Sequence, residues 1–171
     1  ALLDCEAIQQ RFALNEQAVT VIRQWCRETH IRWALSAEDK AVLDLPATEA
    51  NSWRVGLDRL LLGYALPLSD DDGGWRLFDG QSGVDGIRGE RAQTMAQLCA
   101  FVDALDRARQ RLKQSNTAQQ WQQTLLGLLT QFFKPQHDNA RDQADILSIT
   151  QALASLVEST ELATFEQTMP I

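Results

Sequence analysis

Apolar residues between positions 51 and 66 recur at spacings of three and four, which is the pattern of a helix with a buried face. The members of this stripe are Trp53, Leu57, Leu60, Leu61 and Tyr64. Three further apolar residues widen it toward a second face: Val55, Leu62 and Leu66. The pattern therefore predicts a helix over residues 51–66 that its neighbours contact from two directions. Asn51 or Ser52 can act as its N-cap, because either side chain can accept a hydrogen bond from a first-turn N–H group.

Two glycines lie inside this expected helix. Gly56 and Gly63 each cost about 1 kcal/mol relative to alanine in a helix interior. Close approach of a neighbouring element would explain them, and so would simple tolerance of glycine at these positions. The sequence leaves the two explanations equally open.

The same periodicity predicts helices in most of the chain. The first ones cover residues 1–12, 15–29, 37–44 and 87–114, with Asn15 and Ser36 as caps of the second and third. Asn116 or Thr117 caps a further helix that ends before Pro135, Asp138 or Asn139 begins the last long one, and Ser159 or Thr160 can cap a short final helix through Phe165. The side chains expected to face inward are Val19, Ile22, Trp25, Cys26, Met95, Leu98, Val102, Leu105, Leu112, Trp121, Leu125, Leu128, Leu129, Phe132, Phe133, Ile146, Ile149, Leu153, Leu156 and Val157.

One long stretch, residues 69–89, has no helical pattern. It carries Asp70–Asp72 and several glycines, and we expect a surface loop with at most a short extended piece around Trp75 to Phe78. Connections between the long helices are short, which favours antiparallel neighbours. The fold class is therefore all-α: an irregular multi-helix bundle with one long Gly/Asp-rich loop. We expect a single domain, with N-terminal helices over 1–66, the loop over 67–89 and a long-helix bundle over 90–171.

Composition and charge narrow the classes of function. Of the 171 residues, 44% are hydrophobic and 23% are charged, as in a globular protein. The formal net charge of −7 disfavours free-standing, non-specific binding to a phosphate backbone. The three cysteines are isolated, which indicates neither disulfides nor a zinc site and favours a reducing cytoplasm. No apolar run approaches the roughly 18 residues of a membrane span. The chain opens ALLDCEA and ends at Met169-Pro170-Ile171, and we expect it to be a domain excised from a longer protein.

Residues that could support catalysis or bind metal are few. His30 and His137 are not at ligand spacing with another His or Cys. The run Asp70–Gly74 has Gly74 where an EF-hand loop needs its third oxygen ligand, so we interpret it as a solvated turn. The glycines between 80 and 89 are followed by no Gly-Lys-Ser/Thr, and the chain contains no G-x-S-x-G. We therefore expect a non-catalytic chain that holds no cofactor and no metal.

Basic residues gather at the end of the longest expected helix. Arg107 and Arg111, and separately Arg109 and Lys113, are four residues apart and form two adjacent basic ridges. Cations at a helix C-terminus complement the helix dipole. This effect, together with solvation of the side chains, is sufficient to explain why basic residues gather there. Contact with DNA or with a protein partner is the functional alternative.

The segment from residue 11 to 66 carries a family resemblance. The matching residues are Arg11-Phe12, Ile31-Arg32-Trp33, Leu45-Pro46-Ala47-Thr48, Trp53-Arg54, Gly56-Leu57, Arg59 and Leu61-Leu62-Gly63-Tyr64-Ala65. The helix ending at Trp25 and, downstream of the segment, Phe132-Phe133 fit the same family. They resemble the RecC family, the gamma subunit of exodeoxyribonuclease V. Arg32, Arg54 and Arg59 match positions of the family. They are therefore candidate contact residues, in addition to the four basic residues near the end of the longest expected helix. An arginine that pairs with a buried carboxylate such as Asp58 would look the same in sequence.

The resemblance implies a function that the residues alone do not. Members of this family are similar to helicases that have lost motor motifs, and they work in a cytoplasmic bacterial complex with a helicase-nuclease beta subunit and a helicase alpha subunit. That complex processes DNA double-strand ends, using ATP and Mg through its other subunits. By chain order this stretch resembles the 2B-like insertion of the second helicase-like domain. Two hypotheses follow: a non-catalytic domain that shapes the DNA channel or docks the partner helicase, or a purely structural module that contacts only its own subunit.

Overall fold

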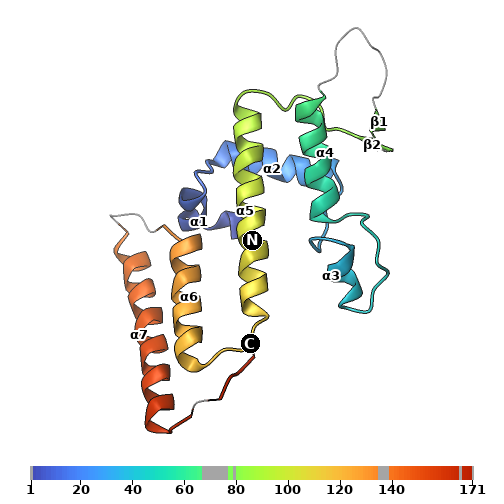
Figure 1. Cartoon of the computed structure of the whole chain (residues 1–171). Helices are drawn as coiled ribbons and strands as arrows, with labels where there is room; N and C mark the ends of the chain where they lie inside the picture. The colour runs from blue at the N-terminus through green and yellow to red at the C-terminus, as the bar shows by residue number, and fades with distance from the viewer. Residues whose placement is uncertain (1, 67–76, 79, 135–138, 166, 171) are drawn as a thin grey trace. The chain divides into compact units, whose positions relative to one another are not determined.

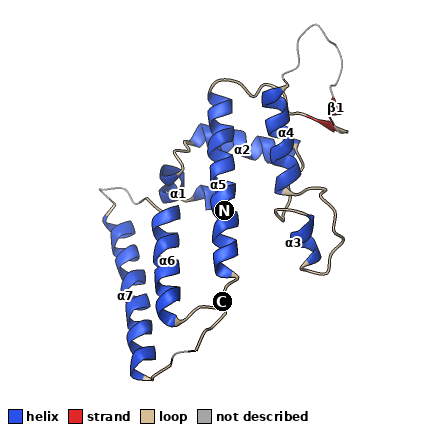
Figure 2. Ribbon diagram, viewed as in Figure 1, coloured by secondary structure: helices blue, strands red, loops and turns tan. Residues whose placement is uncertain are grey.

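Most of the segments in which the apolar periodicity predicts a helix are helical in the structure. In a computed structural model, which describes residues 2–66, 77–78, 80–134, 139–165 and 167–170, these residues form seven α-helices, one 3-10 turn and a two-stranded hairpin (Figure 1). Their bounds are η1 Leu2–Asp4, α1 Glu6–Arg11, α2 Glu16–Glu28, α3 Ala37–Ala41, α4 Trp53–Ala65, β1 Leu77–Phe78, β2 Gln81–Ser82, α5 Glu90–Leu112, α6 Ala118–Phe132 and α7 Ala140–Leu162. The expected helical class is confirmed (Figure 2).

Contacts divide the chain into two compact units, and the division falls within α5. One unit comprises Ala1–Ala13 with Phe101–Ile171, and the other comprises Leu14–Ala100. Each unit has buried apolar residues of its own. None of the described helices is both long and apolar enough to cross a membrane.

The Leu14–Ala100 unit has its core around α2. Asn15 caps this helix as expected, since its side chain accepts a hydrogen bond from the backbone N of Ala18 at 2.7 Å. Trp25 is fully buried, whereas Cys26, which was also expected to face inward, is half-buried. The other core residues of this unit are Leu14, Ala18, Val19, Ile22, Ile31, Leu60, Val84, Ile87, Met95 and Leu98.

Helix α4 buries a narrower stripe than expected. Ser52 is its N-cap, and the buried positions along it are Gly56, Leu60 and Gly63. Leu61, Tyr64 and Leu66 are 44%, 55% and 43% exposed, so the expectation that they lie in the core was wrong. The remaining members of the expected stripe are half-buried: Trp53, Val55, Leu57 and Leu62.

The two glycines of α4 explain this narrow stripe. A Cβ on Gly56 would collide with the side chain of Ile31, and a Cβ on Gly63 would collide with the backbone of Val84. Close approach, rather than simple tolerance, is therefore the reason for both glycines. Because the neighbouring elements reach α4 at glycine backbone, the larger side chains on either side of these contacts stay partly in solvent.

The irregular stretch contains a short hairpin. Strand β1 pairs antiparallel with β2, with Leu77 opposite Ser82 and Phe78 opposite Gln81. Leu77–Phe78 confirms part of the expected extended piece, while Trp75 and the Asp70–Gly74 run lie outside the described residues. Strand β2 lies against α4 (Figure 1).

Helix α5 begins later than expected. It starts at Glu90, not at Ile87, because Gly86 and Gly89 adopt positive φ values of 73° and 56°. Ile87 is a core residue of the preceding loop, with 1% of its surface exposed. Within α5 the buried residues include Phe101, Val102, Ala104 and Ala108, whereas Leu105 and Leu112, both expected inward, are half-buried.

The Ala1–Ala13 and Phe101–Ile171 unit is built on α6. Helices α6 and α7 lie side by side and run in opposite directions (Figure 1). Helix α1 packs on α6: the backbone N of Lys134 donates to Ala7 O at 3.1 Å, and Phe12 meets Phe101 edge to face with ring centroids 5.1 Å apart. The C-terminal segment is held by Trp121, whose Nε1 donates to Met169 O at 2.7 Å.

Helix α7 differs from expectation in two ways. It continues to Leu162, so the separate short helix from Ser159 or Thr160 to Phe165 was wrong. The hydroxyls of Ser159 and Thr160 donate to the carbonyls of Ser155 and Val157 inside the helix instead of capping a new one. Of the residues expected inward, Val157 is buried, Ile146 and Leu153 are half-buried, and Ile149 and Leu156 are exposed. Asn139 caps the start of α7, as expected, by accepting from Arg141 N and Asp142 N.

Thr117 is predicted to stabilise α6 through a complete capping box. Its Oγ1 accepts from Gln120 N at 3.3 Å, and Gln120 Oε1 accepts from Thr117 N at 3.0 Å. Thr117→Ala should lower the free energy of unfolding by about 1 kcal/mol, measured by urea titration with circular dichroism. Thr130→Ala is the control, because the Thr130 hydroxyl only bonds back to Leu126 O within the same helix. An equal effect of both substitutions would contradict the capping role.

Candidate contact surfaces

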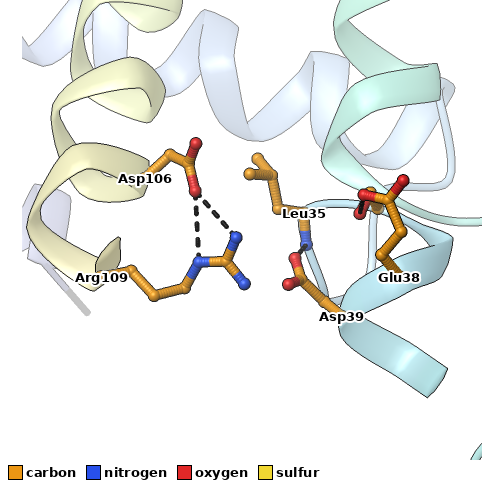
Figure 3. Close-up of polar contacts among 6 residues, drawn as sticks. Leu35, Glu38, Asp39, Asp106 and Arg109 are labelled. Atoms are coloured by element: carbon orange, nitrogen blue, oxygen red, sulfur yellow. Dashed lines mark hydrogen bonds and ion pairs between the residues drawn. The ribbon is translucent and has the colours of Figure 1, made fainter. Parts of the chain in front are cut away.

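The basic residues near the end of α5 do not form two equal ridges. Asp106 holds Arg109 through contacts of its Oδ1 with Nη2 at 2.8 Å and with Nε at 3.2 Å (Figure 3). This pair neutralises one of the four expected cations. Arg107, Arg111 and Lys113 are exposed, and Lys113 lies just beyond the last residue of the helix.

Arg111 has a neighbour that the spacing of basic residues did not predict. Its Nη1 donates to Gln131 Oε1 at 3.2 Å, and the Nε of Arg11 donates to the backbone O of the same glutamine at 2.9 Å. Helices α1 and α6 and the C-terminal part of α5, all in one unit, thus bring two guanidinium groups to one residue. Arg11 is part of the Arg11-Phe12 pair that carries the family resemblance, and this was the available signal.

The three N-terminal arginines have different environments. Arg59 is structural: its Nε donates to Ser82 O at 3.0 Å and its Nη1 to Glu28 O at 3.4 Å, which ties β2 and the end of α2 to α4. It binds carbonyl groups and not a buried carboxylate, and Asp58 itself is exposed. Arg32 and Arg54 have exposed side chains, and their backbone N–H groups pair the segment after Ile31 with the start of α4.

Lys40 is a buried cation that sequence reasoning missed. Only 6% of its surface is exposed, and its Nζ donates to the carbonyls of Thr48 and Ala50 and lies 5.8 Å from the ring centroid of Trp33. It joins α3 to the segment that precedes α4. In the same region the backbone N of Leu35 donates to Asp39 Oδ2 at 3.2 Å (Figure 3). The signal for Lys40 was weak, since a lysine within an acidic helix normally predicts a solvated side chain.

An apolar groove lies between α4 and the hairpin. It has a volume of about 510 Å³ and is lined by Asp58, Leu61, Leu62, Ala65, Leu66, Phe78 and Gln81. Phe78 is 64% exposed, and nearby Leu77 and Tyr64 are also exposed. The groove therefore presents aliphatic and aromatic side chains to solvent with one carboxylate at its lining.

A second hollow is more polar. It measures about 520 Å³ and is lined by Thr117, Ala118, Gln119, Val157, Thr160, Glu161, Thr164 and Phe165. Gln119 Nε2 donates to Glu161 Oε1 at 3.3 Å across the start of α6 and the end of α7. This hollow links the two helices and brings together no set of groups suited to acid–base chemistry.

The described residues contain no group of three or more His, Cys, Asp or Glu side chains placed to hold a metal ion. Burial raises the pKa of the Cys26 thiol, which keeps it protonated and poorly nucleophilic. His30 follows the end of α2 with a positive φ of 57°, and His137 lies outside the described residues. What the described residues offer is contact surface: the exposed basic residues near the end of α5 and the apolar groove beside α4.

Comparison with known proteins shows the family to which the chain belongs. A family model described as the RecBCD enzyme subunit RecC fourth domain matches residues 1–171. RecC of Escherichia coli (strain K12) is 29% identical over 174 residues, covering 100% of this chain and 14% of that protein. RecC of Haemophilus influenzae is 30% identical over 139 residues, covering 81% of this chain and 11% of that protein. The chain thus spans a small part of these curated relatives. It belongs to the RecC family and corresponds to the fourth domain of that RecBCD subunit.

Proposed function

We propose that this chain is a non-catalytic domain that docks a partner subunit within a RecBCD-type helicase-nuclease. The observation that carries the proposal is the solvent-exposed apolar groove between α4 and the hairpin. The resemblance supplies the setting: a cytoplasmic complex that processes DNA double-strand ends, with the ATP and Mg chemistry in its other subunits. In that setting the domain occupies the 2B-like position and supports the DNA channel by holding a neighbouring helicase subunit in place.

The groove has the composition of a binding surface. Exposed apolar patches rimmed by polar residues mark protein contacts, because water around them is released on association. Aromatic and large aliphatic anchors such as Phe78, Leu61 and Leu66 carry most of the energy of such contacts. The excess of acidic residues in the chain favours a protein partner for this face over a phosphate backbone.

A second candidate is the purely structural module. Its support is that the chain spans only 14% of the Escherichia coli relative, so the rest of the same subunit offers a large surface that could cover the groove. The two candidates agree that protein fills the groove. They differ in whether the covering residues belong to another subunit or to the same one.

The substitution pair Leu61→Glu and Phe78→Glu, placed in the full-length subunit, distinguishes the docking domain from the purely structural module. We expect affinity for the helicase-nuclease beta subunit or the helicase alpha subunit, measured by surface binding, to fall at least about tenfold, because charges would be buried in an apolar contact. Leu147→Glu is the control, since Leu147 is 57% exposed on α7 and outside the groove. An unchanged affinity with a lower melting temperature of the subunit alone would favour the structural module, and no change in either would refute both.

A further inference from the structure

We propose that Arg11 and Arg111, held over Gln131, bind the phosphodiester backbone of a nucleic-acid strand. The site lies in the Ala1–Ala13 and Phe101–Ile171 unit, whereas the docking groove lies in the other unit. The inference takes only the DNA-processing setting from the proposed function. Docking and phosphate binding use different residues, so each can fail while the other stands.

The two guanidinium groups are positioned by the fold and not by sequence proximity. Arg11 is in the last turn of α1, Arg111 is in the last turn of α5, and Gln131 is the penultimate residue of α6. The contacts, 2.9 Å from Arg11 Nε to the Gln131 carbonyl and 3.2 Å from Arg111 Nη1 to its side-chain oxygen, leave both arginine residues exposed. Gln131 thus holds two cations near each other without neutralising either of them.

Most of the donors on these arginines are available to a ligand. A guanidinium carries five N–H donors, and each of these arginines uses one of them on Gln131. Neither arginine has a carboxylate partner among the residues that the structure describes. Planar guanidinium groups match the oxygens of a phosphate with pairs of parallel hydrogen bonds, so two adjacent ones can hold one phosphate group from two sides.

The surrounding charges favour a polyanion over a single small anion. Arg107 lies one turn before Arg111 on α5, and Lys134 follows α6 three residues after Gln131; both are exposed. Asp103 is exposed one turn before Arg107 and Glu6 is exposed at the start of α1, and Arg109 is neutralised by Asp106. The helix dipole explains why cations lie at the ends of α1 and α5. It does not require two arginines from different helices to share one neutral residue.

The decisive variant is Gln131→Glu. A carboxylate of nearly the same shape keeps the side-chain acceptor, and the backbone carbonyl that accepts from Arg11 is unchanged, so the fold is retained. The new carboxylate forms an ion pair with Arg111 and places a negative charge beside Arg11, which withdraws the site from a phosphate. We expect affinity for a labelled oligothymidylate of about 20 nucleotides, measured by fluorescence anisotropy at about 50 mM salt, to fall at least about tenfold. The slope of log affinity against log salt should become shallower by about 0.7 for each phosphate that the variant no longer neutralises.

Gln151→Glu supplies the matched control, because Gln151 is exposed on α7 and the substitution adds the same charge outside the basic surface. In the unmodified chain, the Nε–H NMR signals of Arg11 and Arg111 should shift on addition of the strand. Equal decreases in affinity for the two variants, no binding by the unmodified chain, or arginine signals that stay unmoved would each overturn the proposal. Displacement of the strand by polyglutamate at equal charge concentration would also overturn it, in favour of an acidic protein segment.

Discussion

Gly63→Ala should lower the free energy of unfolding by about 2 to 3 kcal/mol. The added Cβ would collide with the backbone of Val84, and a Cβ on Gly83 would in turn lie 2.6 Å from Gly63 N, so two stretches of backbone meet at glycines. Overpacking usually costs about 1 to 3 kcal/mol, and here the obstacle is backbone that cannot rotate away. Alanine returns only about 1 kcal/mol through its better helix propensity. Urea unfolding followed by circular dichroism measures the net decrease.

Gly127→Ala is the matched control for this prediction. Gly127 is also inside a helix, α6, but a Cβ there would meet no atom within 4 Å. The same substitution should therefore raise stability by about 1 kcal/mol. If Gly63→Ala were neutral or stabilising, the close contact between α4 and the segment before α5 would not exist in solution.

Lys40→Met should destabilise the region between α3 and α4 by about 2 kcal/mol. Methionine has a similar length but cannot donate to the carbonyls of Thr48 and Ala50, and it removes the cation beside Trp33. Hydrogen bonds from a charged donor contribute about 1.5 to 3 kcal/mol each, and release of a buried charge recovers part of this contribution. Amide hydrogen exchange in the segment from Leu45 to Asn51 should accelerate, and urea unfolding should begin earlier.

Lys113→Met serves as the comparison for Lys40, because Lys113 is exposed beyond the end of α5. Its substitution should leave stability within about 0.5 kcal/mol of the unmodified chain. Matching decreases in stability for the two variants would mean that the buried contacts of Lys40 contribute nothing specific.

The contacts that define the candidate surfaces could not be predicted from the sequence. Spacing along one helix was enough to nominate Arg107, Arg109, Arg111 and Lys113, but it could not show that Asp106 holds Arg109. It also could not pair Arg11 with Arg111, because Gln131, the residue that both of them contact, lies 120 positions from Arg11 and 20 positions from Arg111. The groove was missed for the same reason: the periodicity placed Leu61 and Leu66 in the core, and only the hairpin that carries Phe78 defines the surface that they line.

The sequence by itself determined the helical class, most helix positions and the capping residue Asn15, because periodicity and capping act within a few residues of the chain. It narrowed the cap of α6 to Asn116 or Thr117 and that of α7 to Asp138 or Asn139, and the structure selected Thr117 and Asn139. The sequence also contained the residues between positions 11 and 66 that resemble the RecC family. Only the tertiary structure decided which side of α4 is buried, why Gly56 and Gly63 are glycines, and which arginines keep free donors. These properties depend on contacts between segments distant in sequence. Such contacts are set by how the helices pack, and no local pattern encodes them.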